Sequence, residues 1–135
     1  TLHVGLGTFA PVKSEKIEEH IMHSEWYQIT AEQAEALNRS ESLTAVGTTC
    51  VRVLESAPKK DGRFVASSGE TDIFITPGYE FASVDHLITN FHLPKSTLLM
   101  LIAAFTGFDE MKEIYDHAIR EKYRFYSFGD AMLLL

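Results

Sequence analysis

The stretch ITNFHLPKSTLLMLIAAF, residues 88–105, decides the fold that this sequence can adopt. Its last eight residues, 98–105, are all apolar, and a helix without a polar face is stable only when other elements bury it. The polar residues that lead into this segment are Asn90, His92, Lys95 and Ser96. The sequence therefore predicts a buried helix with a polar N-terminal end, and those side chains have either a structural or a chemical role.

Strand-like and helix-like patterns alternate along the rest of the chain. Thr30 and Gln33 have the spacing of a capping box, in which the hydroxyl and the amide each bind a free backbone N–H group. We expect strands over residues 25–29, 43–46, 71–76, 84–88 and 131–134. We expect helices over residues 30–38, 47–57, 94–106 and 109–119. This alternation predicts an α/β fold with a mixed sheet flanked by helices.

Proline and glycine mark the expected ends of these elements. Pro94 suits the first turn of a helix, where its missing N–H group would have no partner, and Ser96 or the residues just before Pro94 can cap that helix. Gly107 can end it in a left-handed conformation. Asp109 is then expected to cap the next helix, and residues 58–62 are expected to form a loop.

Size and charge limit the function classes. The 135 residues are enough for one domain. A net charge of −7 excludes the broad positive surface on which non-specific nucleic-acid binding depends. Two local basic clusters remain, and each is either an RNA contact or a solvated surface: Lys59 with Lys60 and Arg63, and Arg120 with Lys122 and Arg124.

The chain also carries signals of cellular location. Cys50 is the single cysteine and cannot form an internal disulfide, which fits a reducing cytoplasm. The longest apolar run is far shorter than the ~18 residues of a membrane span, and no basic-then-apolar leader opens the sequence. We therefore expect a cytoplasmic protein without membrane association. Because Thr1 opens a strand-like segment, we also expect the chain to be a piece of a longer protein.

The segment HIMHSEWY places His20, His23 and Glu25 close together. On a helix the two histidines share a face and Glu25 does not, so the spacing gives little support to a metal site. On a strand His23 and Glu25 share a face, and a carboxylate beside an imidazole suits proton transfer. A solvated surface pair is the structural alternative.

Two glycine turns follow strand-like segments, and each carries hydroxyl groups. These turns hold Gly5, Gly7 and Thr8 in GLGTF, and Thr48 in VGTT. Their backbone N–H groups could approach a polar or anionic ligand, although neither turn completes a dinucleotide fingerprint. Asp72 and Tyr79 lie around a third turn with several aromatic residues, which indicate either a core or a platform that stacks on bases.

Six stretches, in this order, resemble the C-terminal part of one family, the S-adenosylmethionine:tRNA ribosyltransferase-isomerases of queuosine biosynthesis. They are LHVGLGTFAPV, HIMHSEWY, GTTCVRVLES, GETDIFITPGYEF, DHLITNFHLPKSTLLMLIAAF and YRFYSFGDAML. The resemblance spans nearly all of residues 1–135 and implies that they form the C-terminal part of the main α/β domain. It also implies that an N-terminal portion, with an inserted β-barrel, lies outside the chain.

The resemblance implies that S-adenosylmethionine acts as a ribosyl donor. Its ribosyl part is transferred to 7-aminomethyl-7-deazaguanine at the tRNA wobble position and isomerised to give epoxyqueuosine, with release of adenine and methionine. This reaction needs a base beside the sulfonium-bearing carbon and an acid for the departure of adenine. We assign His23, oriented by Glu25, as the base and His92 as the acid.

The remaining candidates bind substrate. Lys95, Ser96 and the helix start would hold a carboxylate or phosphate, Arg52 would reach a phosphate, and Tyr79 would stack on a base. Hydroxyls or base edges would be bound by Asn90, Asp72, Thr8 and Thr48, next to the turn of Gly5 and Gly7. The expected partners are S-adenosylmethionine as co-substrate and tRNA, without a metal, and the oligomeric state is left open. The alternative is a tRNA-binding or structural half-domain without independent activity.

Overall fold

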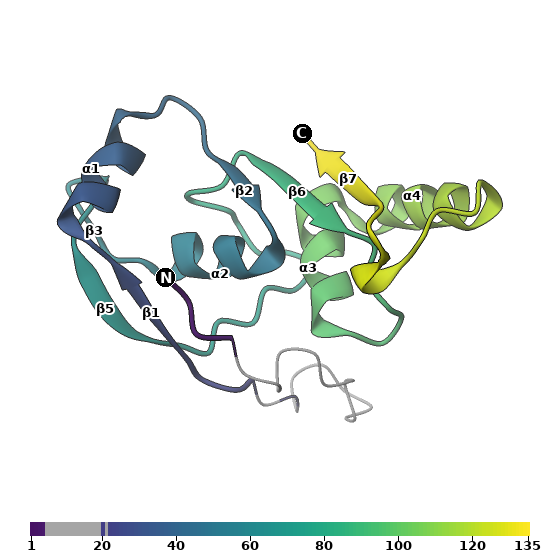
Figure 1. The fold of residues 1–135 in the computed structure, drawn as a ribbon, viewed down its shortest axis with the longest axis horizontal. Coiled ribbons are helices and arrows are strands. Elements are labelled where there is room, and N and C mark those ends of the chain that lie inside the picture. Colours follow the sequence, from purple (N-terminus) through teal and green to yellow (C-terminus); the bar gives the residue numbers. More distant parts are fainter. Residues whose placement is uncertain (5–19, 21) are drawn as a thin grey trace.

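The computed structural model describes residues 1–4, 20 and 22–135. Its strands are β1 (Glu25–Ile29), β2 (Thr44–Val46), β3 (Lys59–Lys60), β4 (Arg63–Phe64), β5 (Ser67–Thr71), β6 (His86–Asn90) and β7 (Ala131–Leu134). Its helices are α1 (Ala31–Arg39), α2 (Thr48–Ser56), α3 (Thr97–Thr106) and α4 (Phe108–Arg120), and a 3₁₀ turn covers Tyr126–Phe128. Figure 1 shows β1 and β5 side by side near α1, and the strands β2, β6 and β7 near the other helices.

The central sheet has the order β2-β6-β7. β2 pairs with β6 in parallel, and β7 pairs with β6 in antiparallel orientation. β1 and β5 form a separate antiparallel pair, and β3 and β4 form a short hairpin. The expected α/β fold with a mixed sheet is confirmed.

One face of the central sheet packs against helices. Ala45, Leu87 and Leu134 belong to the main core, together with residues of α2, α3 and α4. Every residue of α3 is buried or half-buried, and Leu101 and Ile102 are almost fully enclosed. The buried apolar helix expected from residues 98–105 is therefore confirmed, and its burial fixes the position of its N-terminal end.

The helix α2 joins the two cores of the molecule. Val51 belongs to the main core, whereas Val53 belongs to a smaller core that β1, α1 and β4 complete. Tyr27 and Ile29 point into this smaller core because alternate residues of β1 are buried. The capping box at the start of α1 is confirmed, with Thr30 and Gln33 each accepting the other's backbone N–H.

The expected strand over 71–76 is wrong. β5 ends at Thr71, where that strand was expected to begin, because all five residues of β5 pair with β1, from Glu25↔Thr71 to Ile29↔Ser67. The apolar residues that follow Thr71 are buried or half-buried, but they do not form a strand. Ile75 belongs to the main core.

The loop expected over 58–62 is also wrong, because β3 begins at Lys59 and pairs with β4. Asp61 and Gly62 connect the two strands, and both have positive φ, 52° and 76°. This is the geometry that favours Asp-Gly in a two-residue hairpin turn.

Two helix starts differ from expectation. α3 begins at Thr97 with Ser96 as its N-cap, so Pro94 lies in the preceding turn and not in the helix. Gly107 ends α3, as expected, with φ 89° and ψ 155°, which is not a left-handed helical conformation. The same glycine is the N-cap of α4, so Asp109 lies within the first turn. There its negative charge interacts favourably with the helix dipole.

Candidate functional site

The parallel strands β2 and β6 end at the same edge of the sheet. Val46 pairs with Ile88, and the N–H group of Gly47 donates to the Ile88 carbonyl at 2.8 Å. α2 begins directly after β2, and α3 begins after a short connection from β6. Ligands of open α/β sheets bind outside the carboxyl ends of the strands, and helix N-termini favour anions. We call this region the carboxyl edge; it comprises Gly47, Thr48, Asn90, His92, Lys95 and Ser96.

Several of these groups hold the backbone in place. Gly47 has φ 89°, a conformation that a side chain would strain. The Asn90 amide donates to the Tyr126 carbonyl at 2.6 Å and thereby joins β6 to the 3₁₀ turn. The Ser96 hydroxyl donates to the Leu93 carbonyl at 2.8 Å and accepts from the Leu99 N–H group at 3.2 Å. Asn90 and Ser96 therefore have structural partners in the free protein.

His92 is only 4% exposed. Its Nε2 lies 3.1 Å from the Thr89 hydroxyl oxygen, and its backbone N–H donates to the Tyr115 hydroxyl at 2.9 Å. Burial lowers the pKa of His92 to about 4 and raises the pKa of Tyr115 to about 12. His92 is therefore neutral near pH 7. The acid role expected from the sequence would require a bound substrate that raises the pKa of His92 or accepts a hydrogen bond from its neutral ring.

A buried ion pair connects β1 to α2. The Arg52 guanidinium donates to the Glu25 carboxylate, and the two residues are 2% and 3% exposed. Arg52 also lines a small cavity of about 10 Å³ that includes Thr97 and Leu98, at the start of α3. The structure thus brings Arg52 and the N-terminal end of α3 together.

The Glu25–Arg52 pair was not expected from the sequence. Glu25 was expected beside His23, but His23 is exposed, whereas Glu25 is buried on the same face of β1 as Tyr27 and Ile29. That alternation was the available signal, because a carboxylate on the apolar face of a strand needs a buried partner.

The other candidates are placed elsewhere or lie outside the described part. Asp72 is exposed just after β5. The Tyr79 hydroxyl donates to the Glu55 carboxylate at 3.2 Å, near the C-terminal end of α2 and so away from the carboxyl edge. Burial, followed by the negative charge of Glu55, raises the pKa of Tyr79 to about 12. The remaining candidates, Gly5, Gly7 and Thr8, lie outside the described residues.

Glu55 is a polar residue that the sequence did not single out. Its carboxylate accepts the backbone N–H groups of Ala82, Ser83 and Val84 at 2.9, 3.0 and 3.0 Å. These bonds hold the segment that leads into β6, so the role of Glu55 is structural.

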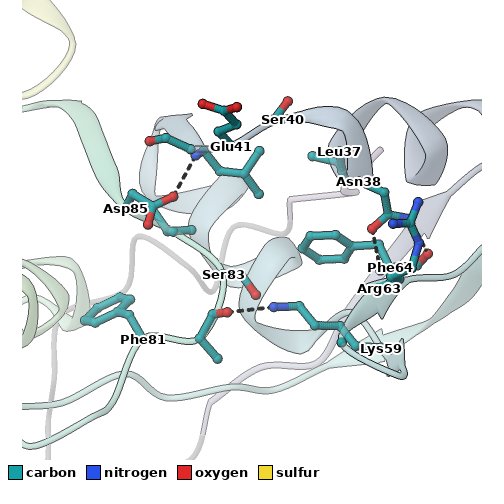
Figure 2. A pocket seen from close by; sticks show the side chains of 15 residues that line it. Leu37, Asn38, Ser40, Glu41, Lys59, Arg63, Phe64, Phe81, Ser83 and Asp85 are labelled. Atoms are coloured by element: carbon teal, nitrogen blue, oxygen red, sulfur yellow. Dashed lines mark hydrogen bonds between the residues drawn. The ribbon is translucent and has the colours of Figure 1, made fainter.

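A separate polar pocket of about 350 Å³ lies between the end of α1, the β3–β4 hairpin and residues 81–85. Figure 2 shows the Lys59 ammonium bonded to the Ala82 carbonyl, at 2.6 Å, and the Leu43 N–H bonded to Asp85, at 2.7 Å. None of the catalytic or S-adenosylmethionine-binding residues expected from the sequence lines this pocket, but Lys59 and Arg63 of the basic hairpin cluster do. Most of its polar groups have partners within the protein, so it gives no independent indication of a ligand.

Two further observations concern metals and membranes. Within residues 1–4, 20 and 22–135, no group of three His, Cys, Asp or Glu residues is arranged to hold a metal ion. In the same part of the chain, no helix combines the length and the apolar character needed to cross a membrane.

Comparison with known proteins identifies the family. Residues 1–134 match the family described as queuosine biosynthesis protein. The chain belongs to this queuosine biosynthesis family. It is 62% identical, over 99% of its length, to the S-adenosylmethionine:tRNA ribosyltransferase-isomerase of Ralstonia pickettii, and 58% identical to the protein of the same name from Moorella thermoacetica. The chain spans 38% and 40% of these two relatives.

A solved structure has the same fold over most of this chain. The crystal structure of an S-adenosylmethionine tRNA ribosyltransferase from Thermotoga maritima matches with a TM-score of 0.74 and 49% identity. The match covers 82% of this chain and 41% of the other. The mixed α/β arrangement is therefore shared with a solved S-adenosylmethionine tRNA ribosyltransferase.

Proposed function

We propose that the full-length protein transfers and isomerises the ribosyl moiety of S-adenosylmethionine onto 7-aminomethyl-7-deazaguanine at the tRNA wobble position. The products are epoxyqueuosine in tRNA, adenine and methionine. The observation that supports this proposal is the similarity, over 99% of the chain, to proteins named S-adenosylmethionine:tRNA ribosyltransferase-isomerase. Since tRNA is the acceptor, we place the reaction in the cytoplasm.

We further propose that residues 1–135 are the C-terminal part of the main α/β domain. The chain spans about two fifths of the relatives, so the N-terminal portion and an inserted β-barrel would lie outside it. Activity is accordingly proposed for the full-length protein and not for this chain alone.

The carboxyl edge has the chemistry that the donor requires. The donor's carboxylate carries a negative charge. The N-termini of α2 and α3, whose partial positive charge favours an anion, both lie near this edge. Lys95 is exposed there and adds a full positive charge, while Thr48 and Asn90 supply a hydroxyl and an amide. We propose that these groups hold the donor.

The proton transfers are proposed for the two histidines. The sulfonium acidifies the adjacent ribose carbon, and exposed His23 would remove that proton. His92 would donate to the departing adenine. The Glu25–Arg52 pair would hold β1, and with it His23, near the start of α3, because Arg52 bonds to β1 and lines a small cavity together with Thr97 and Leu98.

The reaction is tested with the full-length protein, S-adenosylmethionine and tRNA that carries 7-aminomethyl-7-deazaguanine. We expect equal amounts of adenine, methionine and epoxyqueuosine, measured by chromatography and nucleoside mass spectrometry. Formation of S-adenosylhomocysteine and a methylated nucleoside, or no consumption of the donor, would contradict the proposal.

The site is tested by His23→Gln, with His3→Gln as its control because His3 lies against Trp26 and outside the proposed site. Loss of a general base lowers kcat by about 10²- to 10⁴-fold, and the control is expected to retain full kcat. Lys95→Gln is expected to raise the KM for S-adenosylmethionine with little change in kcat, since Lys95 binds the donor before and during the reaction. Unchanged kinetics in either variant would remove that residue from the site.

A further inference from the structure

The structure distinguishes between the two basic clusters of the sequence. In the cluster near the C-terminus, Arg120 Nε lies 3.3 Å from Glu121. Arg124 binds both oxygens of Asp130, at 2.9 and 3.2 Å, and this pairing lowers the pKa of Asp130. An anionic ligand would have to displace these carboxylates, so this cluster is poorly suited to bind phosphate.

The other cluster, Lys59 with Lys60 and Arg63, lies on the β3–β4 hairpin. One face of this hairpin is anchored to the body of the protein. Phe64 is buried, and the Lys59 ammonium lies 4.7 Å from the centre of its ring while donating to the Ala82 carbonyl. The Asn38 side chain bonds the N–H and C=O groups of Phe64 at 2.8 and 2.9 Å (Figure 2). These contacts hold the hairpin in a fixed position.

In the strand register Lys60 and Arg63 share the other face of the hairpin, and Arg63 also lines the polar pocket beside it. They are directly opposite each other in the strand register, which places their Cβ atoms about 5 Å apart. Both are exposed, and in the part of the chain that the structure describes neither forms an ion pair. Like charges at such a position destabilise a hairpin, and an anion between them would remove that repulsion.

We propose that the β3–β4 hairpin binds the phosphate backbone of the tRNA substrate through Lys60 and Arg63. This inference rests on the proposed function, because it names where the RNA partner is held. The guanidinium of Arg63 matches two phosphate oxygens, and Lys60 adds a point charge. Since the hairpin is already ordered, little conformational entropy is lost when it binds. Because residues 1–135 carry a net charge of −7, RNA binding by this part of the protein would depend on a local positive surface and not on a broad one.

The test is binding of a tRNA transcript to the full-length protein at several salt concentrations. The double variant Lys60→Gln/Arg63→Gln is expected to bind about 10- to 30-fold more weakly at 0.15 M salt. The slope of log K against log salt is expected to fall by about 2, one for each phosphate that the variant no longer neutralises. Lys60→Arg/Arg63→Lys keeps both charges and is expected to retain most of the slope. Affinity for S-adenosylmethionine is expected to be unchanged in both variants, which shows that they are folded.

The matched control is Arg120→Gln/Lys122→Gln, which removes the same two charges from the other cluster and is expected to leave the slope unchanged. Equal weakening by both double variants would show an effect of net charge alone and would overturn the proposal. If wild-type protein modifies tRNA and the hairpin variant binds it normally, the hairpin inference fails while the proposed function stands. If wild-type protein neither binds nor modifies tRNA, both fail.

Discussion

The two faces of the β2-β6-β7 sheet have similar residues and different surroundings. On the inner face Ala45, Leu87 and Leu134 are at most 5% exposed. On the outer face the next residues in register are 65%, 36% and 56% exposed, and they are Val46, Ile88 and Leu133. Strands that are apolar on both faces are typical of sheets covered on both sides. In the described part of the chain α2, α3 and α4 pack against the inner face only, so equally apolar residues make unequal contributions to stability.

The largest loss of stability is expected for Leu87→Ala. Leu87 is fully buried in the main core, and its truncation removes favourable transfer energy and also leaves a cavity. We expect a loss of about 2–5 kcal/mol in the free energy of unfolding, measured by urea denaturation. A loss no larger than that of Leu133→Ala would show that the inner face is loosely packed.

The free energy of unfolding is expected to depend on pH through His92, which lies at the polar end of the inner face. His92 has a pKa of about 4 when folded and bonds to Thr89, which is buried on the inner side of β6. Because the pKa of an unfolded histidine is about 6.5, the unfolded chain binds a proton first as pH falls. Stability is therefore complete above about pH 6.5 and decreases by up to roughly 3 kcal/mol on the way to pH 4.

The pH effect is measured by urea denaturation at several pH values. His92→Gln keeps a group that can bond to Thr89 and lacks a titrating ring, so its stability is expected to depend less on pH in this range. A variant with the same pH dependence as wild type would show that other groups are responsible.

A smaller effect is expected for Thr89→Val. It removes the hydroxyl bonded to His92 and leaves a buried ring nitrogen without that partner, which costs about 1–3 kcal/mol. Thr44→Val is the control, because Thr44 is an exposed strand residue of the same type in β2. Equal denaturation midpoints for the two variants would contradict a structural role for the Thr89–His92 bond.

The smallest effect is expected for Leu133→Ala. Leu133 is 56% exposed, and substitutions at such surface positions change stability by about 0.5 kcal/mol or less. We expect its unfolding midpoint to be close to that of the unchanged chain. A loss above about 2 kcal/mol, comparable to a core substitution, would show that the outer face is buried in solution.

The sequence predicted those features that depend on neighbouring residues. The burial of α3 followed from eight consecutive apolar residues, the start of α1 from Thr30 and Gln33, and β7 from its own pattern. These are confirmed because capping bonds and side-chain periodicity act over only a few residues.

Predictions that needed distant partners were less successful. The strand expected over 71–76 is replaced by β5, because pairing with β1, some forty residues earlier, determines its limits. Glu25 pairs with Arg52, which is 27 residues away; the alternation of β1 indicates that Glu25 needs a buried partner, but no local pattern identifies that partner as Arg52. At the candidate site, Thr48 and Asn90 were named from the sequence, but only the parallel pairing of β2 with β6 brings both to the carboxyl edge.

The amino-acid sequence by itself determined the family resemblance, the order of most helices and strands, and the apolar character of α3. The tertiary structure decided which sheet face is covered, that His92 is neutral near pH 7, and which basic cluster forms no ion pair within the described residues. The physical reason is that secondary structure depends on bonds between near neighbours, whereas burial and electrostatic pairing depend on groups that only folding brings together.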